Sequence, residues 1–182
     1  MLYEEKPIKS ETIYDGRIIK VKVETVELPD MKYAKREVVE HAPSVAILAI
    51  SERNTIYMVR QYRIGAKEET LELPAGLVDP GENPQDTAIR ELQEEIHLKP
   101  KKLEYLLDTY SSPGFCNEKV SLFVARDFEP SILDRDSTEF LEIEEYTIEE
   151  LYKMVLNFEI LDAITIIGIF YAYNHLRKTN DA

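Results

Sequence analysis

The chain has 182 residues, of which 44% are hydrophobic, and its 22 basic and 35 acidic side chains give a formal net charge of −13. This length suits one domain with a small appendage, and the hydrophobic content is enough for a packed core, which excludes a disordered chain. The negative charge argues against a nucleic-acid binder that neutralises backbone phosphates. A phosphate substrate stays compatible with this charge if metal ions supply positive charge.

The compartment is indicated by three features of the sequence. A single cysteine, Cys116, cannot form an intramolecular disulfide, which favours a reducing environment. Residues 1–10 lack the apolar core of a signal peptide. The most apolar run, residues 163–173, is too short to span a bilayer and is predicted to be a buried helix. We therefore expect a cytoplasmic protein whose partners include neither a membrane nor a nucleic acid.

Residues 1–42 are predicted to form a small β unit. Valines alternate with charged residues within 17–28, which is the period of a strand, and residues 33–41 follow a turn as the next strand. A unit of this size buries little surface by itself. We therefore expect it to pack on another surface, and a second copy of the chain is the candidate.

Residues 43–182 are predicted to form a second, larger domain. Residues 44–50 are a continuous apolar run, typical of a strand covered on both faces, and residues 55–63 return as the next strand. Further strands are expected at three places along this domain: 71–73, 102–110 and 119–127.

A helix is predicted to follow a loop over residues 75–82. Asn83 suits its N-cap, Pro84 its first position and Asp86 its third, as in a capping box. Four apolar residues fall on one side of this helix and are expected to face the core: Ala88, Ile89, Leu92 and Ile96.

Two more helices are predicted near the end of the chain. Thr147 and Glu150 repeat the capping-box signature before a helix at about 148–157. Asp162 caps the last helix, which is expected to run to about Lys178. Helices that follow strands in this way predict a mixed sheet within an α/β or α+β sandwich.

The first predicted helix carries carboxylates at helical spacing, where like charges repel. Glu91 and Glu95 lie one turn apart, and Glu94 lies beside them. Such a cluster is either a solvated face or a site for a cation, because hard divalent cations such as Mg²⁺ take oxygen ligands.

The residues around the cluster resemble the Nudix box, G-x5-E-x7-R-E-U-x-E-E-x-G-U, in which U is aliphatic. The match comprises Gly76, five residues, Glu82, seven residues, Arg90-Glu91-Leu92, one residue, Glu94-Glu95, one residue and His97-Leu98. The departure is His97, where the family has Gly. A side chain in the left-handed conformation that commonly ends a helix costs on the order of 1 kcal/mol, so His97 affects the helix end more than the carboxylates.

This resemblance implies a Nudix-type α/β/α sandwich and the hydrolysis of a nucleoside diphosphate linked to another group. It also implies Mg²⁺, with Mn²⁺ as the alternative, held by Glu91, Glu95, Glu94 and the backbone carbonyl of Ala75. Arg90 and Glu82 resemble the family's supporting pair, which orients the metal ligands.

Other segments are similar to ADP-ribose pyrophosphatases: residues 72–82, 61–63 and 111–115, together with the N-terminal β unit. In that family two chains exchange their N-terminal strands, so the resemblance implies a homodimer. The phosphate-contacting arginine maps to Arg63, whose fork suits a phosphate. Arg36 is a candidate for the adenosine end, and Gly76 and Pro113 complete the implied substrate-binding set.

The attacking water needs a base, and family members place a carboxylate for it on a loop between the last strand and the penultimate helix. That loop is predicted over residues 133–145. Glu139 matches best and Asp136 is the alternative. Glu118 is a further carboxylate within reach of the site by sequence position.

The first hypothesis for function is therefore the Mg²⁺-dependent hydrolysis of ADP-ribose to AMP and ribose 5-phosphate. The second is the hydrolysis of GDP-mannose or another nucleotide sugar, which the box does not separate from the first. The third is a catalytically silent domain that senses a nucleotide, although such proteins usually lose box carboxylates that this chain keeps. A calcium-binding loop is excluded, because the EF-hand pattern is missing.

Overall fold

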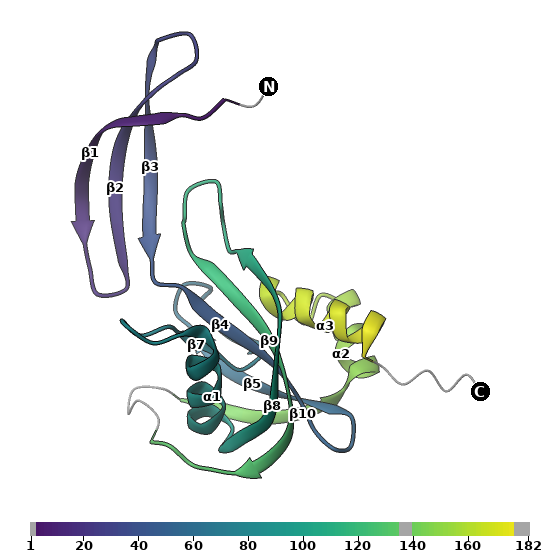
Figure 1. Ribbon diagram of the computed structural model, residues 1–182. Helices are drawn as coiled ribbons and strands as arrows, with labels where there is room; N and C mark the ends of the chain where they lie inside the picture. The colour runs from purple at the N-terminus through teal and green to yellow at the C-terminus, as the bar shows by residue number, and fades with distance from the viewer. Residues whose placement is uncertain (1–2, 135–139, 177–182) are drawn as a thin grey trace. The chain divides into compact units, whose positions relative to one another are not determined.

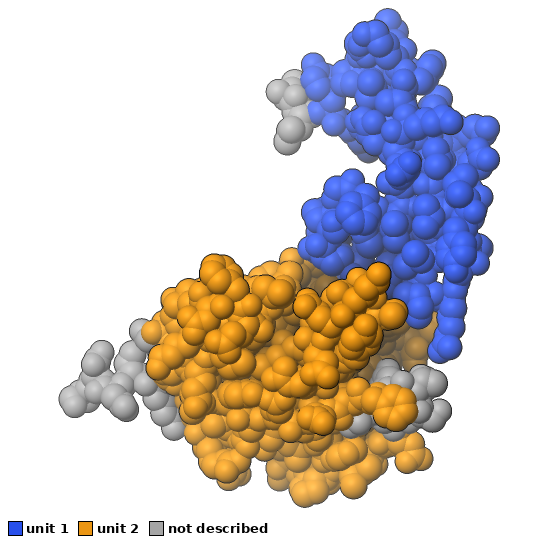
Figure 2. Space-filling model, turned by 180° about the vertical axis from the view of Figure 1, so that it is seen from behind, with its two compact units in different colours: residues 1–43, 110–119 blue, residues 44–109, 120–182 orange. Residues whose placement is uncertain are grey.

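A computed structural model of the protein describes residues 3–134 and 140–176. The chain divides into two compact units, coloured separately in Figure 2. Unit 1 contains residues 1–43 and 110–119, and unit 2 contains residues 44–109 and 120–182. Unit 1 thus combines the beginning of the chain with a loop from the middle of it.

Unit 1 is built on an antiparallel sheet of three strands in the order β1-β2-β3 (Figure 1). The strands are β1 (Lys6–Asp15), β2 (Ile19–Glu27) and β3 (Tyr33–His41). β2 and β3 confirm the predicted strands. β1 was not predicted, because its residues are all exposed and its apolar side chains do not alternate. The loop of residues 111–118 pairs with β3 through Val39, whose N–H donates to the Phe115 carbonyl at 2.7 Å.

Unit 2 is built on a mixed sheet of seven strands. Five of them follow the order β10-β5-β4-β9-β8, with β6 on β5 and β7 on β4. β4 and β9 are parallel, whereas β4 with β5 and β5 with β10 are antiparallel, as a mixed sheet requires. The strands are β4 (Ser44–Ile50), β5 (Thr55–Arg63), β6 (Glu68–Glu72), β7 (Ala75–Leu77), β8 (Leu98–Tyr110), β9 (Lys119–Pro130) and β10 (Leu141–Thr147).

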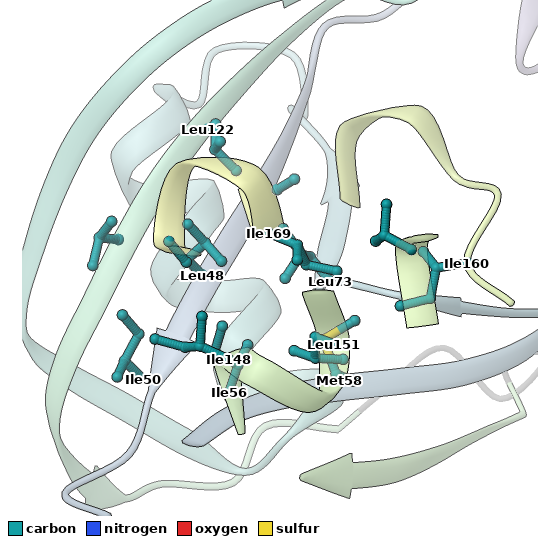
Figure 3. Packing of buried hydrophobic residues seen from close by; sticks show 14 of the residues in the cluster. Leu48, Ile50, Ile56, Met58, Leu73, Leu122, Ile148, Leu151, Ile160 and Ile169 are labelled. Carbon is teal, nitrogen blue, oxygen red and sulfur yellow. The ribbon is translucent and has the colours of Figure 1, made fainter. Parts of the chain in front are cut away.

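Three helices cover this sheet on its two faces: α1 (Pro84–Glu95), α2 (Ile148–Leu156) and α3 (Ala163–His175). Alternate residues of β4 point to opposite layers, so every residue of the strand is buried. Val45, Ile47 and Ala49 pack with Ala88 and Leu92 of α1 and with its C-cap residue Ile96. Ala46, Leu48 and Ile50 pack with Ile148 and Leu151 of α2 and Ile169 of α3, as Figure 3 shows for most of them. The predicted α/β/α sandwich is therefore confirmed.

The helix starts follow the predicted caps. The Asn83 side chain accepts hydrogen bonds from the N–H groups of Gln85 and Asp86, both at 3.0 Å, and Pro84 takes the first position. Thr147 forms a complete capping box with Glu150 at the start of α2. Local side-chain chemistry is enough to set these boundaries.

Several predicted boundaries were wrong. β8 begins at Leu98 rather than at residue 102, and β9 extends to Pro130 rather than to residue 127. Three further boundaries concern short or acidic segments. The strand expected at 71–73 is β6, at 68–72, because it pairs with β5 from Arg63–Glu68 to Val59–Glu72. The loop expected at 75–82 begins as β7, which pairs with β4. The loop expected at 133–145 ends in β10, which pairs with β5 from Leu141 onward. In each case pairing with a neighbouring strand imposed an extended conformation on a short or acidic segment.

Within the described ranges, none of the helices has the length and hydrophobicity needed to cross a membrane. The last helix, α3, ends at His175 with Leu176 as its C-cap, before the predicted end at about Lys178, which lies outside the described residues.

Candidate active site

Helix α1 buries two of its carboxylates against the segment that precedes it. Glu91 is 7% exposed and Glu95 is 4% exposed. The N–H of Ala75 donates a hydrogen bond of 3.0 Å to Oε2 of Glu95. The carboxylate of Glu91 lies so close to Gly76 that a β-carbon there would stand 1.9 Å from Oε1. These two carboxylates are therefore not part of a solvated helix face.

Arg90 links the carboxylates of α1 to the preceding loop. Its Nη1 donates to Glu91 Oε1 at 2.7 Å and to Glu94 Oε2 at 3.0 Å. Its Nη2 donates to Glu82 Oε2 and to the Leu77 carbonyl, both at 3.1 Å. A planar guanidinium with several bound acceptors has little freedom to rotate, so Arg90 fixes the positions of the acidic groups around it.

Arg90 and Glu82 stabilise one another's charged forms. The hydrogen bond from Arg90 lowers the pKa of Glu82 below its usual 4.5. Burial lowers the pKa of Arg90, but the hydrogen bond to Glu82 and the charges of Glu91 and Glu94 outweigh it, so the pKa lies above its ordinary value. Arg90 therefore stays charged and offsets part of the negative charge of the carboxylates.

The donor chemistry of α1 fits a hard divalent cation. Glu95 brings a buried carboxylate oxygen to the backbone of Ala75 and Glu91 brings one to that of Gly76, and the Glu94 side chain is 19% exposed beside them. Oxygen ligands of this kind are those that Mg²⁺ prefers, and Mn²⁺ accepts them as well. As the side chains lie, no three His, Cys, Asp or Glu residues within 3–134 and 140–176 are grouped to hold a metal ion. Arg90 instead bridges Glu91 and Glu94.

His97 ends the helix in the left-handed conformation that the family's Gly adopts readily. Its φ is +61°, directly after the C-cap residue Ile96. The N–H of Ile96 donates to the Leu92 carbonyl at 3.2 Å, and the His97 carbonyl accepts from Ser131 at 3.0 Å. The helix end thus adopts the left-handed conformation with His rather than Gly, and Glu91 and Glu95 are buried on this helix.

Arg63 lies at the end of β5 with its guanidinium on a buried carboxylate. Its Nε and Nη2 donate to the two oxygens of Glu72 at 2.9 and 2.6 Å. The pKa of Arg63 is raised by this hydrogen bond, with further contributions from the charges of Glu95 and Asp162. The Arg63 side chain is 46% exposed, and it faces a pocket of about 320 Å³ beside Asp162. Arg63 is therefore placed in the electrostatic field of the carboxylate helix.

Glu72, the partner of Arg63, was not singled out from the sequence. It lies between Leu71 and Leu73, which are both buried in the core. A carboxylate between two core residues of one strand is itself a signal, because alternation places it on the opposite face of the sheet.

The remaining predicted site residues belong to unit 1 or lie outside the described residues. Arg36 and Pro113 belong to unit 1, where Nε of Arg36 donates to Glu5 at 2.9 Å and Pro113 is exposed. Glu118 also belongs to unit 1 and lies 3.6 Å from Nδ1 of His41. The predicted base, Glu139, and its alternative, Asp136, lie outside the described residues.

Comparison with known proteins identifies the family. A model of the NUDIX domain matches residues 40–164. The chain belongs to the Nudix family. Residues 5–39 of this Nudix hydrolase match a second model, the nucleoside diphosphate sugar hydrolase N-terminal domain.

Relatives of known name cover nearly the whole of this Nudix hydrolase. It is 42% identical over 172 residues to an ADP-ribose pyrophosphatase of Bacillus subtilis (strain 168), with 92% of each chain covered. It is 39% identical over 172 residues to the methanol dehydrogenase activator of Bacillus methanolicus, with 93% of each covered. The crystal structure of an ADP compounds hydrolase has the same fold, with a TM-score of 0.86, 23% identity, and 97% of this chain and 96% of that chain covered. The Nudix resemblance, including the similarity to ADP-ribose pyrophosphatases, is thereby confirmed.

Proposed function

We propose that this Nudix hydrolase cleaves the pyrophosphate bond of ADP-ribose and releases AMP and ribose 5-phosphate in a Mg²⁺-dependent reaction. The observation that carries the proposal is the burial of Glu91 and Glu95 against Ala75 and Gly76. Burying two carboxylates side by side is costly unless positive charge compensates them. The 42% identity to an ADP-ribose pyrophosphatase supports the choice of substrate.

Each residue of the group has a distinct part in this proposal. Glu91, Glu95, Glu94 and the Ala75 carbonyl would hold the ion, which when bound neutralises phosphate charge and lowers the pKa of water. Arg90 and Glu82 keep the carboxylates oriented through their shared hydrogen bonds. Arg63 contacts a phosphate of the substrate, and the backbone at Gly76 is a second contact of the substrate.

We further propose Glu139 as the base that takes the proton from the attacking water, with Asp136 as the alternative. This assignment rests on the family resemblance of the loop that holds both residues. Arg36 and Pro113 remain predicted substrate contacts on the same basis, Arg36 at the adenosine end.

The homodimer is also a proposal, and the exposed surface of unit 1 supports it. Six large apolar side chains of its three strands and their connecting turns are more than half exposed in the single chain: Ile8, Ile13, Tyr14, Ile18, Met31 and Tyr33. A small sheet with such a surface gains stability by being covered. Light scattering should give twice the 21.1 kDa mass of one chain, and a monomer at micromolar concentration would rule the dimer out.

A substrate comparison tests the proposed activity. We expect kcat/KM for ADP-ribose to exceed that for GDP-mannose and for a nucleoside triphosphate, in Mg²⁺ and with a coupled phosphatase reporting product. A preference for GDP-mannose would keep the metal-dependent chemistry and replace ADP-ribose by a nucleotide sugar. Binding of ADP-ribose without any turnover in Mg²⁺ would instead favour a nucleotide sensor.

A second candidate function comes from the relative in Bacillus methanolicus. Its name is methanol dehydrogenase activator, and it matches this chain at 39% identity over nearly its whole length. The direct test adds the protein to a methanol dehydrogenase and follows alcohol oxidation. An increase that the Glu95→Gln variant does not give would support activation through hydrolysis, and no increase would remove this candidate.

A further inference from the structure

We propose that Glu72 is a positioning residue that holds Arg63 in the orientation needed to bind a substrate phosphate. The inference rests on the proposed function and extends it to a residue outside the Nudix box. The evidence is the number of hydrogen bonds to the buried Glu72 carboxylate. It accepts from Thr70 and Gln61 as well as from Arg63, which is more than an isolated ion pair would show.

The Glu72 carboxylate accepts hydrogen bonds from three side chains. Oε1 accepts from Arg63 Nε at 2.9 Å and from Thr70 Oγ1 at 2.6 Å. Oε2 accepts from Arg63 Nη2 at 2.6 Å and from Gln61 Nε2 at 3.4 Å. Thr70 and Gln61 therefore orient the carboxylate, and the carboxylate in turn orients the guanidinium.

The register of β5 and β6 brings Arg63 and Glu72 together. Gln61 is opposite Thr70, and Arg63 is opposite Glu68, so the Arg63 side chain reaches along the strand pair to Glu72. These residues share one face of the sheet because side chains alternate. Val59, opposite Glu72, packs on the α1 layer, so this is the face that the carboxylate helix covers. The pair is thus part of the same layer as the proposed metal ligands.

The Arg63 guanidinium uses one edge for Glu72 and leaves another edge for an anion. Its donors lie in one plane, and Glu72 takes the edge formed by Nε and Nη2. The edge that includes Nη1 consequently points away from Glu72. The Arg63 side chain is 46% exposed whereas that of Glu72 is 9% exposed, so the arginine is held from behind by a buried group. This arrangement reduces the conformational freedom that Arg63 must lose when it binds an anion.

The charge of Glu72 and its positioning of Arg63 would affect phosphate binding in opposite directions. Glu72, Glu68 and Asp162 all line the pocket beside Arg63, and each adds negative charge where a phosphate would bind. If Glu72 acted only through its charge, Glu72→Gln would strengthen binding of an anion. If it positions Arg63, the same substitution weakens binding, because an amide has one acceptor oxygen and one NH₂ donor and cannot accept a guanidinium bond on each of two atoms. The direction of the change therefore separates the two roles.

The experiment is equilibrium binding of ADP-ribose and of inorganic pyrophosphate in EDTA, where metal-dependent turnover is excluded. We expect Glu72→Gln to weaken both ligands at least about tenfold, and Thr70→Val to weaken them less, since it removes one bond to the carboxylate. Glu69→Gln makes the same charge change on the opposite face of β6 and should leave both affinities unchanged. Adenosine, which has no phosphate, should bind all variants equally.

Several results would overturn the inference. Unchanged or tighter pyrophosphate binding by Glu72→Gln would do so, as would an equal loss for adenosine, which indicates general disruption. If Glu72→Gln does not fold, Thr70→Val decides the matter by the same criterion. Wild-type protein that binds pyrophosphate but neither binds nor hydrolyses ADP-ribose would refute the proposed substrate while the comparison of variants still stands. No binding of either ligand by the wild type would overturn the inference about Glu72, whereas the proposed function is refuted by a lack of ADP-ribose hydrolysis in Mg²⁺.

Discussion

The carboxylate of Glu91 lies against the α-carbon of Gly76, closer than any side chain at residue 76 would allow. An added β-carbon would stand 1.9 Å from Oε1 and 2.0 Å from Cδ of Glu91. Because Glu91 is 7% exposed, its carboxylate has little space into which to move. The Gly of the box thus serves the position of a proposed metal ligand rather than the flexibility of a loop.

Gly76→Ala should therefore lower turnover strongly and also destabilise the fold, by about 1–3 kcal/mol, because the added β-carbon overpacks a buried site. Displacing a ligand carboxylate by about 1 Å can cost on the order of a hundredfold in rate. Gly65→Ala is the matched control, since a β-carbon there meets nothing within 4 Å. Steady-state rates and thermal unfolding of both variants would check this. Equal rates for the two variants would show that Glu91 can relocate or does not take part.

Glu95→Gln should preserve the fold, because the amide oxygen can still accept from the N–H of Ala75. Turnover should fall by at least roughly a hundredfold, through loss of the charge that holds the metal ion. Glu104→Gln, an exposed carboxylate of β8, should keep normal turnover. The rates should be measured over a Mg²⁺ series. Near-normal turnover at low Mg²⁺ would remove Glu95 from the site.

The Glu82–Arg90 pair predicts a pH dependence of stability. The pKa of Glu82 is lower in the folded protein than its usual 4.5, so the folded state favours the ionised form. Its contribution, about 1 kcal/mol, should be fully present above the unfolded pKa and lost as pH falls through the lower folded pKa. Unfolding free energies of wild type and Glu82→Gln should accordingly differ at pH 7 and converge in acid. A difference that stays constant down to pH 3 would contradict this account.

His97→Gly should stabilise the protein. The His97 φ of +61° is in the left-handed region, and relief of this strain is worth on the order of 1 kcal/mol. Lys67→Gly, at a turn residue with a φ of +60°, provides a second site with the same backbone cause. Urea unfolding should show a gain for both variants, with turnover unchanged for His97→Gly. A loss of turnover would instead assign His97 a chemical role.

Glu139→Gln tests the proposed base. We expect kcat to fall while the affinity for ADP-ribose, measured in EDTA, stays the same, because a base acts in the transition state and not in binding. Asp136→Asn serves as the comparison within the same loop. If Asp136→Asn lowers kcat and Glu139→Gln does not, the roles are exchanged, and an effect on affinity alone excludes Glu139 as the base.

Features fixed by neighbouring residues were predictable from the sequence, whereas features fixed by strand register were not. The caps at Asn83 and Thr147 and the buried run of β4 follow from local chemistry, and the structure agrees with them. β10 was missed because its acidic, half-exposed residues become a strand only by pairing with β5.

The candidate site likewise contains some features that were predictable from the sequence and others that were not. The spacing of Glu91 and Glu95 on one helix is visible in the sequence, since both lie on a single element. The bond between Arg63 and Glu72 depends on the hairpin of β5 and β6, which brings together side chains from two strands. No period in the sequence specifies that register, so the partner of Arg63 emerged only from the structure.

The most direct test of the central claim is chromatographic detection of products from ADP-ribose incubated with the protein, in Mg²⁺ and in EDTA. The account predicts equal amounts of AMP and ribose 5-phosphate in Mg²⁺, and neither product in EDTA or with Glu95→Gln. Undiminished product in EDTA would contradict the metal site on α1, and intact ADP-ribose in Mg²⁺ would contradict the proposed function.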